Sequence, residues 1–281
     1  GLAAYRRMPL AVALPETEEQ VAKILSICFE MQIPVVPRGS GTGLSGGAMP
    51  ISQGLVLSLA KLKKIISIDP FTRTAVVQPG VRNLAISEAV AHLGLYYAPD
   101  PSSQIACSIG GNVNENSGGV HCLKYGLTLH NVLRVRGVLM NGEVVEFGSL
   151  APDSPGLDLM AVMMGSEGML AVVTEVTVKL VAKPKLARVI MASFDDIEKG
   201  GNAVAAIIAA GIIPAGLEMM DKATARAVEE FVHAGYDLDA AAILLCESDG
   251  TPEEVAEEIE RMTKVLEPVS YTHLRAHETR E

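Results

Sequence analysis

Positive charge is scarce in this sequence. Its 281 residues include 23 lysines and arginines against 33 aspartates and glutamates, which gives a formal net charge of −10. Nucleic-acid binding needs clustered basic side chains that displace counterions from phosphates, and no such cluster occurs along the chain. We therefore expect no nucleic-acid partner.

Paired cysteines and long apolar runs are also missing. No C-x-x-C pair is present to provide local ligands for zinc or an iron–sulfur cluster, and reduced thiols suit a cytoplasmic protein. The longest uncharged apolar run, Gly200 to Leu217, is shorter than the ~20 residues of a bilayer span and contains Asn202 and Pro214. We expect neither a metal site nor a membrane helix. The cysteines are Cys28, Cys107, Cys122 and Cys246.

Glycine, by contrast, is concentrated in residues 39–47, GSGTGLSGG, where Gly41 to Gly46 spells G-x-G-x-x-G. In a Rossmann fold this motif opens a helix, and an acidic residue follows about 20 positions later. Here Pro50 and a strand-like run, residues 55–59, follow the loop, and the helical pattern of residues 15–33 precedes it. The predicted order is strand, helix, strand, glycine loop, strand. This order disfavours an NAD-dependent Rossmann enzyme, which we keep as an alternative.

A glycine loop of this kind can still hold phosphates. Glycine permits positive φ, so successive backbone N–H groups can converge on an anion. The side chains of Arg38, Ser40, Thr42 and Ser45 add donors. We favour a phosphate-binding loop over a plain surface turn.

A second glycine-rich region covers residues 100–126. It contains DPSS at 100–103, SIGGN at 108–112, NSGG at 116–119 and KYG at 124–126. Small residues let the backbone approach a flat ring, and Asn and Ser can bind ring carbonyls and hydroxyls. Tight turns between strands could explain one of these stretches but hardly all four. Two such regions predict one long ligand.

These motifs carry a resemblance to a known family. Residues 37–43, 100–103, 108–112, 121–126, 165–168 and 172–175 resemble the FAD-binding domain of the vanillyl-alcohol-oxidase, or PCMH-type, flavoprotein superfamily. Within it they are most like the FAD-linked D-2-hydroxyacid dehydrogenases, in the group of glycolate oxidase flavin subunits. The implied fold class is α+β: a two-subdomain PCMH-type FAD-binding fold followed by part of an α+β substrate-capping domain.

The resemblance also implies the cofactor site. Residues 38–47 would wrap the diphosphate, and the other residues would surround the flavin, ribityl and adenine parts. Family members with covalent flavin often have a histidine where Thr42 stands, so we expect non-covalent FAD. The implied FAD-binding residues are Pro37, Arg38, Gly39, Ser40, Gly41, Thr42, Gly43, Ser45, Gly46, Gly47, Gly80, Asp100, Pro101, Ser102, Gly110, Gly111, Asn112, Asn116, Ser117, Gly118, Glu167, Gly168 and Val173.

Three segments divide the chain. We expect the FAD-binding domain at residues 1–182, a partial cap domain at 183–269 and a non-native tail at 270–281, which looks like translated adapter sequence. In the cap we predict strands at 187–194, 217–220 and 241–247 and helices at 197–210, 222–234 and 252–266. The apolar face of the last helix, with Val255, Ile259 and Met262, is expected to lack partners and to be exposed.

His273 and His277 are spaced as zinc ligands can be, but we favour the non-native tail over a metal site. The chain lacks an initial Met, so we expect its true N-terminus to be missing.

Other reactive side chains have less specific interpretations. His121 is either a structural histidine, which we favour, or a contact for an acid substrate. Cys107 and Cys122 flank the flavin motifs, and we favour packing over redox chemistry for both.

The resemblance implies a function for the intact parent. A 2-hydroxy acid such as glycolate or D-lactate would transfer its α-hydrogen as hydride to N5 of FAD. The family's catalytic histidines belong to a C-terminal half that we expect this chain to lack, so no catalytic residue is assigned and we expect the chain alone to be inactive. Implied partners are iron–sulfur and second flavin-like subunits of a glycolate oxidase complex, in the cytoplasm or held by them at the inner membrane. A non-catalytic flavin- or nucleotide-binding module is a further alternative.

Overall fold

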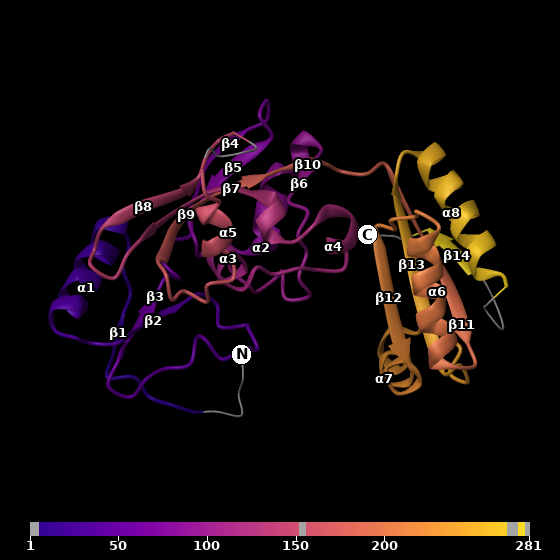
Figure 1. The fold of residues 1–281 in the computed structure, drawn as a ribbon, viewed down its shortest axis with the longest axis horizontal. Coiled ribbons are helices and arrows are strands. Elements are labelled where there is room, and N and C mark those ends of the chain that lie inside the picture. Colours follow the sequence, from indigo (N-terminus) through magenta and orange to yellow (C-terminus); the bar gives the residue numbers. More distant parts are fainter. Residues whose placement is uncertain (1–5, 152–155, 269–274, 279–281) are drawn as a thin grey trace. The chain divides into compact units, whose positions relative to one another are not determined.

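The computed structural model describes residues 6–151, 156–268 and 275–278. The chain forms two compact units (Figure 1). Unit 1 consists of Gly1–Gly119 and Gly126–Lys183, and unit 2 consists of Val120–Tyr125 and Pro184–Glu281. Unit 2 therefore contains a short segment from the N-terminal half of the sequence, which we call the 120–125 segment.

Unit 1 begins with a small parallel sheet. Strands β1 (Ala11–Ala13) and β2 (Val35–Arg38) both pair in parallel with β3 (Leu55–Ser58), in the order β1-β3-β2. Helix α1 (Glu18–Glu30) connects β1 to β2. It starts after Thr17, whose side chain accepts a hydrogen bond from the backbone N–H of Gln20 at 3.3 Å. The predicted order of strand, helix, strand, glycine loop and strand is confirmed.

The larger sheet of unit 1 is antiparallel, with strand order β4-β5-β9-β7-β8. Helices α2 and α3 lie beside it, and the short strands β6 and β10 pair with each other. The remaining elements are short helical turns. The bounds are β4 (Ile65–Asp69), β5 (Thr74–Val77), α2 (Asn83–Val90), η1 (Ala91–Leu93), β6 (Leu95–Tyr96), α3 (Ile109–Glu115), η2 (Thr128–Asn131), β7 (Val132–Val138), β8 (Val144–Gly148), α5 (Leu159–Met163), β9 (Val172–Lys179) and β10 (Val181–Ala182).

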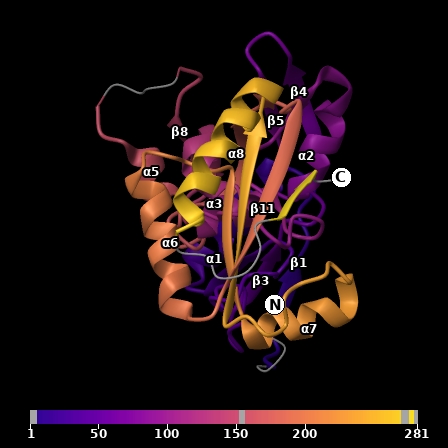
Figure 2. The same cartoon turned by 90° about the vertical axis from the view of Figure 1, so that its right-hand side faces the viewer.

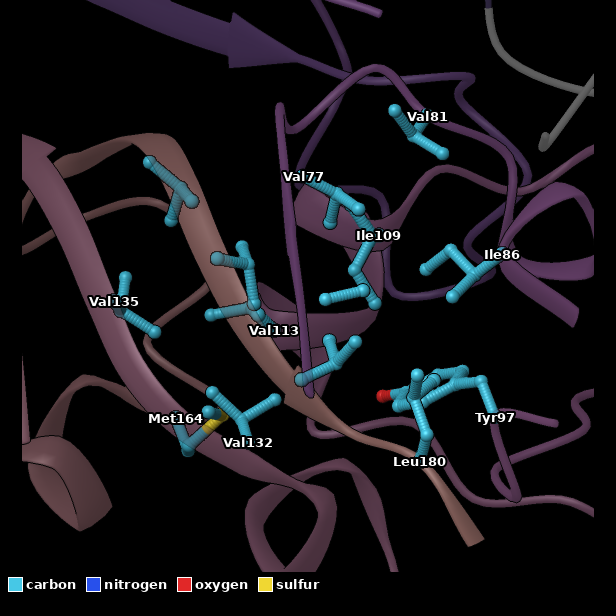
Figure 3. Close-up of a cluster of buried hydrophobic side chains, with 14 of the residues drawn as sticks. Val77, Val81, Ile86, Tyr97, Ile109, Val113, Val132, Val135, Met164 and Leu180 are labelled. Carbon is cyan, nitrogen blue, oxygen red and sulfur yellow. The ribbon is translucent and has the colours of Figure 1, made fainter. Parts of the chain in front are cut away.

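The main core of unit 1 lies between this sheet and the two helices. Val77 and Val135 from the sheet meet Ile86 of α2 and Ile109 and Val113 of α3, and all five are buried (Figure 3). Burial of such side chains removes apolar surface from water, which is the main force holding α2 and α3 in place. The position of α3 matters for function because its other side faces the glycine loop.

Unit 2 is built on a four-stranded antiparallel sheet with strand order β12-β13-β11-β14. Helices α6 and α8 pack on one face, and α7 packs on the other (Figure 2). Helix α8 starts with a capping box, in which Thr251 and Glu254 bind each other's backbone N–H groups. The bounds are α4 (Cys122–Tyr125), β11 (Leu186–Phe194), α6 (Ile197–Ala209), β12 (Gly216–Asp221), α7 (Lys222–Val232), β13 (Ala242–Gly250), α8 (Pro252–Leu266) and β14 (Arg275–Glu278).

The apolar face of α8 differs from the expectation. Val255 and Met262 are fully buried, and Ile259 is partly buried against the same cluster. The prediction that this face lacks partners is wrong, because α6, β11 and β13 lie within the same unit and cover it. Unit 2 therefore has a complete core on this side of its sheet.

The end of the chain also contains regular structure. Strand β14 pairs antiparallel with residues 188–191 of β11. Four residues of the expected non-native tail, 275–278, therefore form a paired strand. Of the two histidines spaced as zinc ligands, His273 lies outside the described residues. No helix in the described ranges combines the length and apolarity needed to cross a bilayer.

Candidate functional site

A cavity of about 360 Å³ lies in unit 1 between the glycine loop and α3. An adjoining cavity of about 400 Å³ shares Pro37, Gly47 and Glu167 with it and is lined mainly by apolar side chains such as Leu25 and Val138. Ligand-binding pockets usually measure about 300–1,000 Å³. The pair offers a polar compartment beside an apolar one, as a long ligand with charged and flat parts requires.

The glycine loop forms one wall of the polar cavity. It leaves β2 at Arg38 and runs to β3 without a helix. Gly41 and Gly46 have φ of +71° and +86°, a backbone conformation that other residues rarely adopt. A Cβ on Gly41 would lie 2.6 Å from Nη2 of Arg38. The loop therefore needs glycine both for its backbone shape and for the close approach of the Arg38 guanidinium.

Helix α3 provides the opposite wall. Ser108, Gly111, Asn114 and Glu115 line the cavity, and their spacing of three to four residues places them on one side of the helix. Within the described part of the chain, Ser108 Oγ and Asn114 Oδ1 are buried and have no hydrogen-bond partner. An unsatisfied buried polar atom costs about 1–3 kcal/mol. Two such atoms at the edge of a cavity fit a ligand with hydrogen-bonding groups.

Asn112, on the inner side of α3, holds the surrounding loops together. Its Oδ1 accepts from Asn83 Nδ2 at 3.0 Å, and its Nδ2 donates to Ser117 Oγ at 3.3 Å and lies 3.4 Å from Cys107 Sγ. Asn83 also donates to the Pro99 carbonyl at 3.0 Å. One buried amide thus positions Ser117 and Cys107 in the cavity wall.

The Gly165–Gly168 turn closes a further side. The Glu167 N–H donates to the carbonyl of Asn114 at 2.8 Å, and Glu167 itself has a φ of +53°. A Cβ on Gly168 would lie 2.7 Å from Pro37 Cγ, so the turn packs directly on the start of the glycine loop. Segments near 37, 114 and 167, far apart in sequence, meet at one place.

Both charged residues that line the polar cavity are acidic. Glu115 and Glu167 both line it, and Ser45 Oγ donates to Glu115 Oε2 at 2.7 Å. Arg38 lies beside Gly41. The carboxylate of Glu115 therefore ties the loop to α3 at the cavity's edge, while the Arg38 guanidinium provides positive charge beside Gly41 without lining the cavity.

The structure brings together more than half of the sequence-predicted site residues. Those lining the two cavities are Pro37, Gly39, Ser40, Gly41, Thr42, Gly43, Gly47, Ser102, Gly111, Asn112, Ser117, Glu167 and Gly168. Those that do not line them are Arg38, Ser45, Gly46, Gly80, Asp100, Pro101, Gly110, Asn116, Gly118 and Val173.

Several members of the second group have visible structural roles. Gly110 packs against Pro79, where a Cβ would approach to 2.6 Å, and Val173 is buried in the core. Asn116 ends α3 in a left-handed conformation and accepts from the Leu129 N–H at 3.0 Å. For these three residues, packing or backbone geometry explains the residue type without a ligand.

Sequence reasoning also missed cavity residues. Ser108, Asn114 and Glu115 belong to the same helix side as the predicted Gly111, so the helical period was the signal that could have identified them. Leu44 and Ala48, between the glycines, carry no chemical signal of their own. The missed lining residues are Leu44, Ala48, Ser103, Cys107, Ser108, Asn114 and Glu115.

The other reactive side chains are His121 and the cysteines. His121 Nε2 lies 3.4 Å from Glu247 Oε2 within unit 2, which supports the interpretation of His121 as a structural histidine. All four cysteines are free thiols. Burial raises the pKa of Cys246 to about 12, so this thiol stays protonated.

Comparison with known proteins gives two family matches. The family model of the FAD binding domain matches residues 9–148, and that of the FAD linked oxidases, C-terminal domain, matches residues 183–281. Glycolate oxidase subunit GlcD of Escherichia coli K12 is 60% identical over 275 residues, covering 98% of this chain and 55% of that protein. The subunit of the same name from Bacillus subtilis 168 is 42% identical over 278 residues, covering 99% and 59%.

A solved structure supports the fold. Substrate-bound p-cresol methylhydroxylase matches 95% of this chain with a TM-score of 0.78 and 22% identity, over 57% of its own length. At this identity the likeness shows the fold alone. The chain spans slightly more than half the length of the curated relatives named above.

Proposed function

Because the chain belongs to the FAD-linked oxidases, we propose that it is the cofactor-binding part of a flavin-dependent 2-hydroxyacid dehydrogenase. The observation that carries this proposal is the cavity between the glycine loop and α3, with its two unpartnered buried atoms on Ser108 and Asn114. Residues 1–182 would form the FAD-binding domain, and the cap would begin at residue 183.

The cavity residues fit FAD group by group. Backbone N–H groups of the glycine loop would bind the diphosphate, and the nearby charge of Arg38, beside Gly41, would favour an anion there. Ser108 and Asn114 would bind polar groups of the cofactor, and the adjoining apolar cavity near Val138 and Leu170 would exclude water around a flat ring. These contacts would satisfy side-chain atoms that have no partner within the described protein.

When bound, FAD supplies an acceptor for the hydride that leaves the α-carbon of the substrate. The described residues would bind and orient the cofactor. We assign no catalytic base, since His121 is paired with Glu247 and Cys107 contacts Asn112. Activity would therefore require groups supplied by the rest of the parent protein.

The proposed substrate is a small 2-hydroxy acid of the glycolate or D-lactate type. Its support is the 60% identity to a glycolate oxidase subunit over nearly the whole chain. To test it, the chain would be extended to the length of its relatives and mixed with glycolate or D-lactate without oxygen. Loss of the flavin absorbance on mixing is expected. A flavin-loaded extended protein that no 2-hydroxy acid reduces would instead favour a non-catalytic flavin-binding module.

We also propose that the FAD is held non-covalently. Thr42 stands in the loop where covalent members of the family have a histidine, and none of the described residues that line the two cavities is a histidine. Acid precipitation of the loaded protein should release the flavin into the supernatant. Yellow colour that stays with the pellet would show a covalent bond.

Partner subunits are the last part of the proposal. The two curated relatives are named as subunits, and we propose that the parent assembles with iron–sulfur and second flavin-like subunits that carry electrons onward. The protein would be cytoplasmic and would reach the inner membrane only through these partners. Copurification of the extended protein with such subunits from its host would support this assembly. An extended protein that is isolated alone and still passes electrons from the hydroxy acid to a quinone at the full rate would contradict it.

A further inference from the structure

One face of the unit 2 sheet, the face on which α7 packs, carries acidic side chains as well as apolar ones. Side chains alternate along β13, so Leu244 and Cys246 face α6 and α8, whereas Ile243 faces α7. Glu247 and Asp249 follow on the same side as Ile243, beyond the residues that α7 covers. The 120–125 segment contacts these two acidic side chains.

The contacts between the segment and β13 are specific. Lys124 Nζ lies 2.5 Å from Asp249 Oδ1 and 2.7 Å from the Asp249 carbonyl oxygen, and Tyr125 Oη donates to Asp249 Oδ2 at 2.6 Å. His121 pairs with Glu247. On the neighbouring strand, a Cβ on Gly216 would lie 3.2 Å from Val120 Cγ1, so β12 also fits closely against the segment.

Asp249 and the segment depend on each other. The Asp249 side chain is only 4% exposed, and a buried carboxylate is strongly unfavourable unless it is paired and hydrogen-bonded. The segment contains one helical turn, α4, which is too short to be stable by itself. Lys124 and Tyr125 thus satisfy the carboxylate, and the carboxylate fixes the turn.

Along the chain, the segment follows the cavity-lining residues almost immediately. Ser117 lines the cavity, and only Gly118 and Gly119 separate it from Val120. The Ser117 carbonyl accepts from the Thr128 N–H at 3.0 Å and from Thr128 Oγ1 at 2.8 Å, just after the segment ends. The chain therefore leaves and rejoins the cavity wall on either side of the residues that Asp249 holds.

We infer that Asp249, through Lys124 and Tyr125, is a positioning residue for the cofactor site, so that FAD binding and the order of the unit 2 sheet are thermodynamically coupled. This inference rests on the proposed function, because it requires FAD in the unit 1 cavity. It assigns unit 2 a role in cofactor binding besides any role in substrate capping. Such coupling is reciprocal. The free energy by which the fixed segment strengthens FAD binding equals the free energy by which bound FAD stabilises the sheet.

The test uses Asp249→Asn in the 281-residue chain. The variant keeps the side-chain shape but removes the charge that binds Lys124. We expect the FAD dissociation constant, measured by flavin fluorescence, to rise about tenfold, within the usual range of coupling between sites. Hydrogen exchange of the β13 amides, residues 242–250, should slow when FAD is added to the unchanged chain and should not slow in the variant.

Two further variants complete the experiment. Glu260→Gln makes the same charge change in an exposed ion pair with Lys264 on α8 and should behave as the unchanged chain in both measurements. Lys124→Gln breaks the same contact from its more exposed side and should reproduce the Asp249→Asn result even if that variant folds poorly.

The outcomes separate the two proposals. FAD binding within twofold of the unchanged chain, with β13 protection retained in both Asp249→Asn and Lys124→Gln, would overturn the inference and leave the proposed function standing. A folded, unchanged chain that binds no FAD would overturn both.

Discussion

The glycine loop of unit 1 and the 120–125 segment of unit 2 are both short connecting segments that adjoin cavity-lining residues in the sequence, but they are held in different ways. The loop, residues 39–47, depends on left-handed glycines and on the hydrogen bond from Ser45 to Glu115. The segment is fixed by a buried carboxylate with two side-chain partners. The difference indicates that the loop is shaped to receive a ligand, whereas the segment is shaped by the protein itself.

Unpartnered and partnered polar groups show the same contrast. Ser108 Oγ and Asn114 Oδ1 border the cavity without partners among the described residues, while Asp249 is buried with its oxygens bonded. Because burial of an unsatisfied group is costly, we propose that a ligand satisfies the two cavity atoms, whereas the fold itself satisfies Asp249. If this comparison is correct, changes in the loop should affect FAD binding more than stability.

The largest effect is expected from Gly41→Val. A β-branched residue strains the left-handed backbone by roughly 2 kcal/mol, and a loop that relaxes to relieve it should bind FAD about 30-fold more weakly. Gly94→Val is the matched control, since Gly94 has a φ of +66° and open space around its Cβ position, outside the cavity lining. Fluorescence titration compares the two. Equal FAD affinity in both variants would exclude the loop from the site.

The next effect concerns stability in unit 2. Removing residues 275–281 deletes β14 and its pairing with β11, and we expect the free energy of unfolding to fall by about 1 kcal/mol. Denaturant midpoints of the trimmed and untrimmed chains measure this. FAD affinity should stay the same, because β14 pairs at the sheet edge away from β13. An unchanged midpoint would show that the strand contributes nothing.

A smaller effect is expected from loosening the loop without straining it. Ser45→Ala removes the hydrogen bond to Glu115, which is worth about 1 kcal/mol or less at this exposed position, so FAD affinity should fall up to about fivefold. Thr72→Ala is a suitable control, as Thr72 lies in the exposed turn between β4 and β5. A loss as large as that of Gly41→Val would mean that the side-chain tie, rather than the backbone, shapes the loop.

The smallest effect concerns the buried thiol of unit 2. The pKa of Cys246 is raised by burial from 9.0 to about 12. The unfolded chain therefore loses this proton as the pH rises above about 9 while the folded chain keeps it, so stability should decline between about pH 9 and 12. Cys246→Ala should be less stable at neutral pH but should show a shallower decline of the urea midpoint. An identical slope in both chains would contradict the assignment.

Much of this fold could be predicted from the sequence, because its helices carry both periodic apolar faces and caps. The spacing of Val21, Leu25 and Cys28 predicts α1. Pro252 and the spacing of Val255, Ile259 and Met262 predict α8. Pro50 and the strand after the loop disfavoured a Rossmann arrangement, and the structure has no helix directly after the loop. These signals are local, so neighbouring residues are enough to reveal them.

The remainder depends on contacts between distant residues. Sequence spacing could not show that α6 and the sheet cover the α8 face. Nor could it show that Gly110 packs on Pro79 while Gly111, its neighbour, faces the cavity, since that requires the orientation of α3. The pairing of Lys124 with Asp249 joins residues 125 positions apart and has no local signal at all.

Direct titration of the purified 281-residue chain with FAD, by equilibrium dialysis with circular dichroism to confirm folding, tests the central claim most directly. The account predicts one bound FAD per chain, displaced by excess ADP-containing flavin analogues and not by NAD. A folded chain that leaves FAD at equal concentration on both sides of the membrane would contradict it.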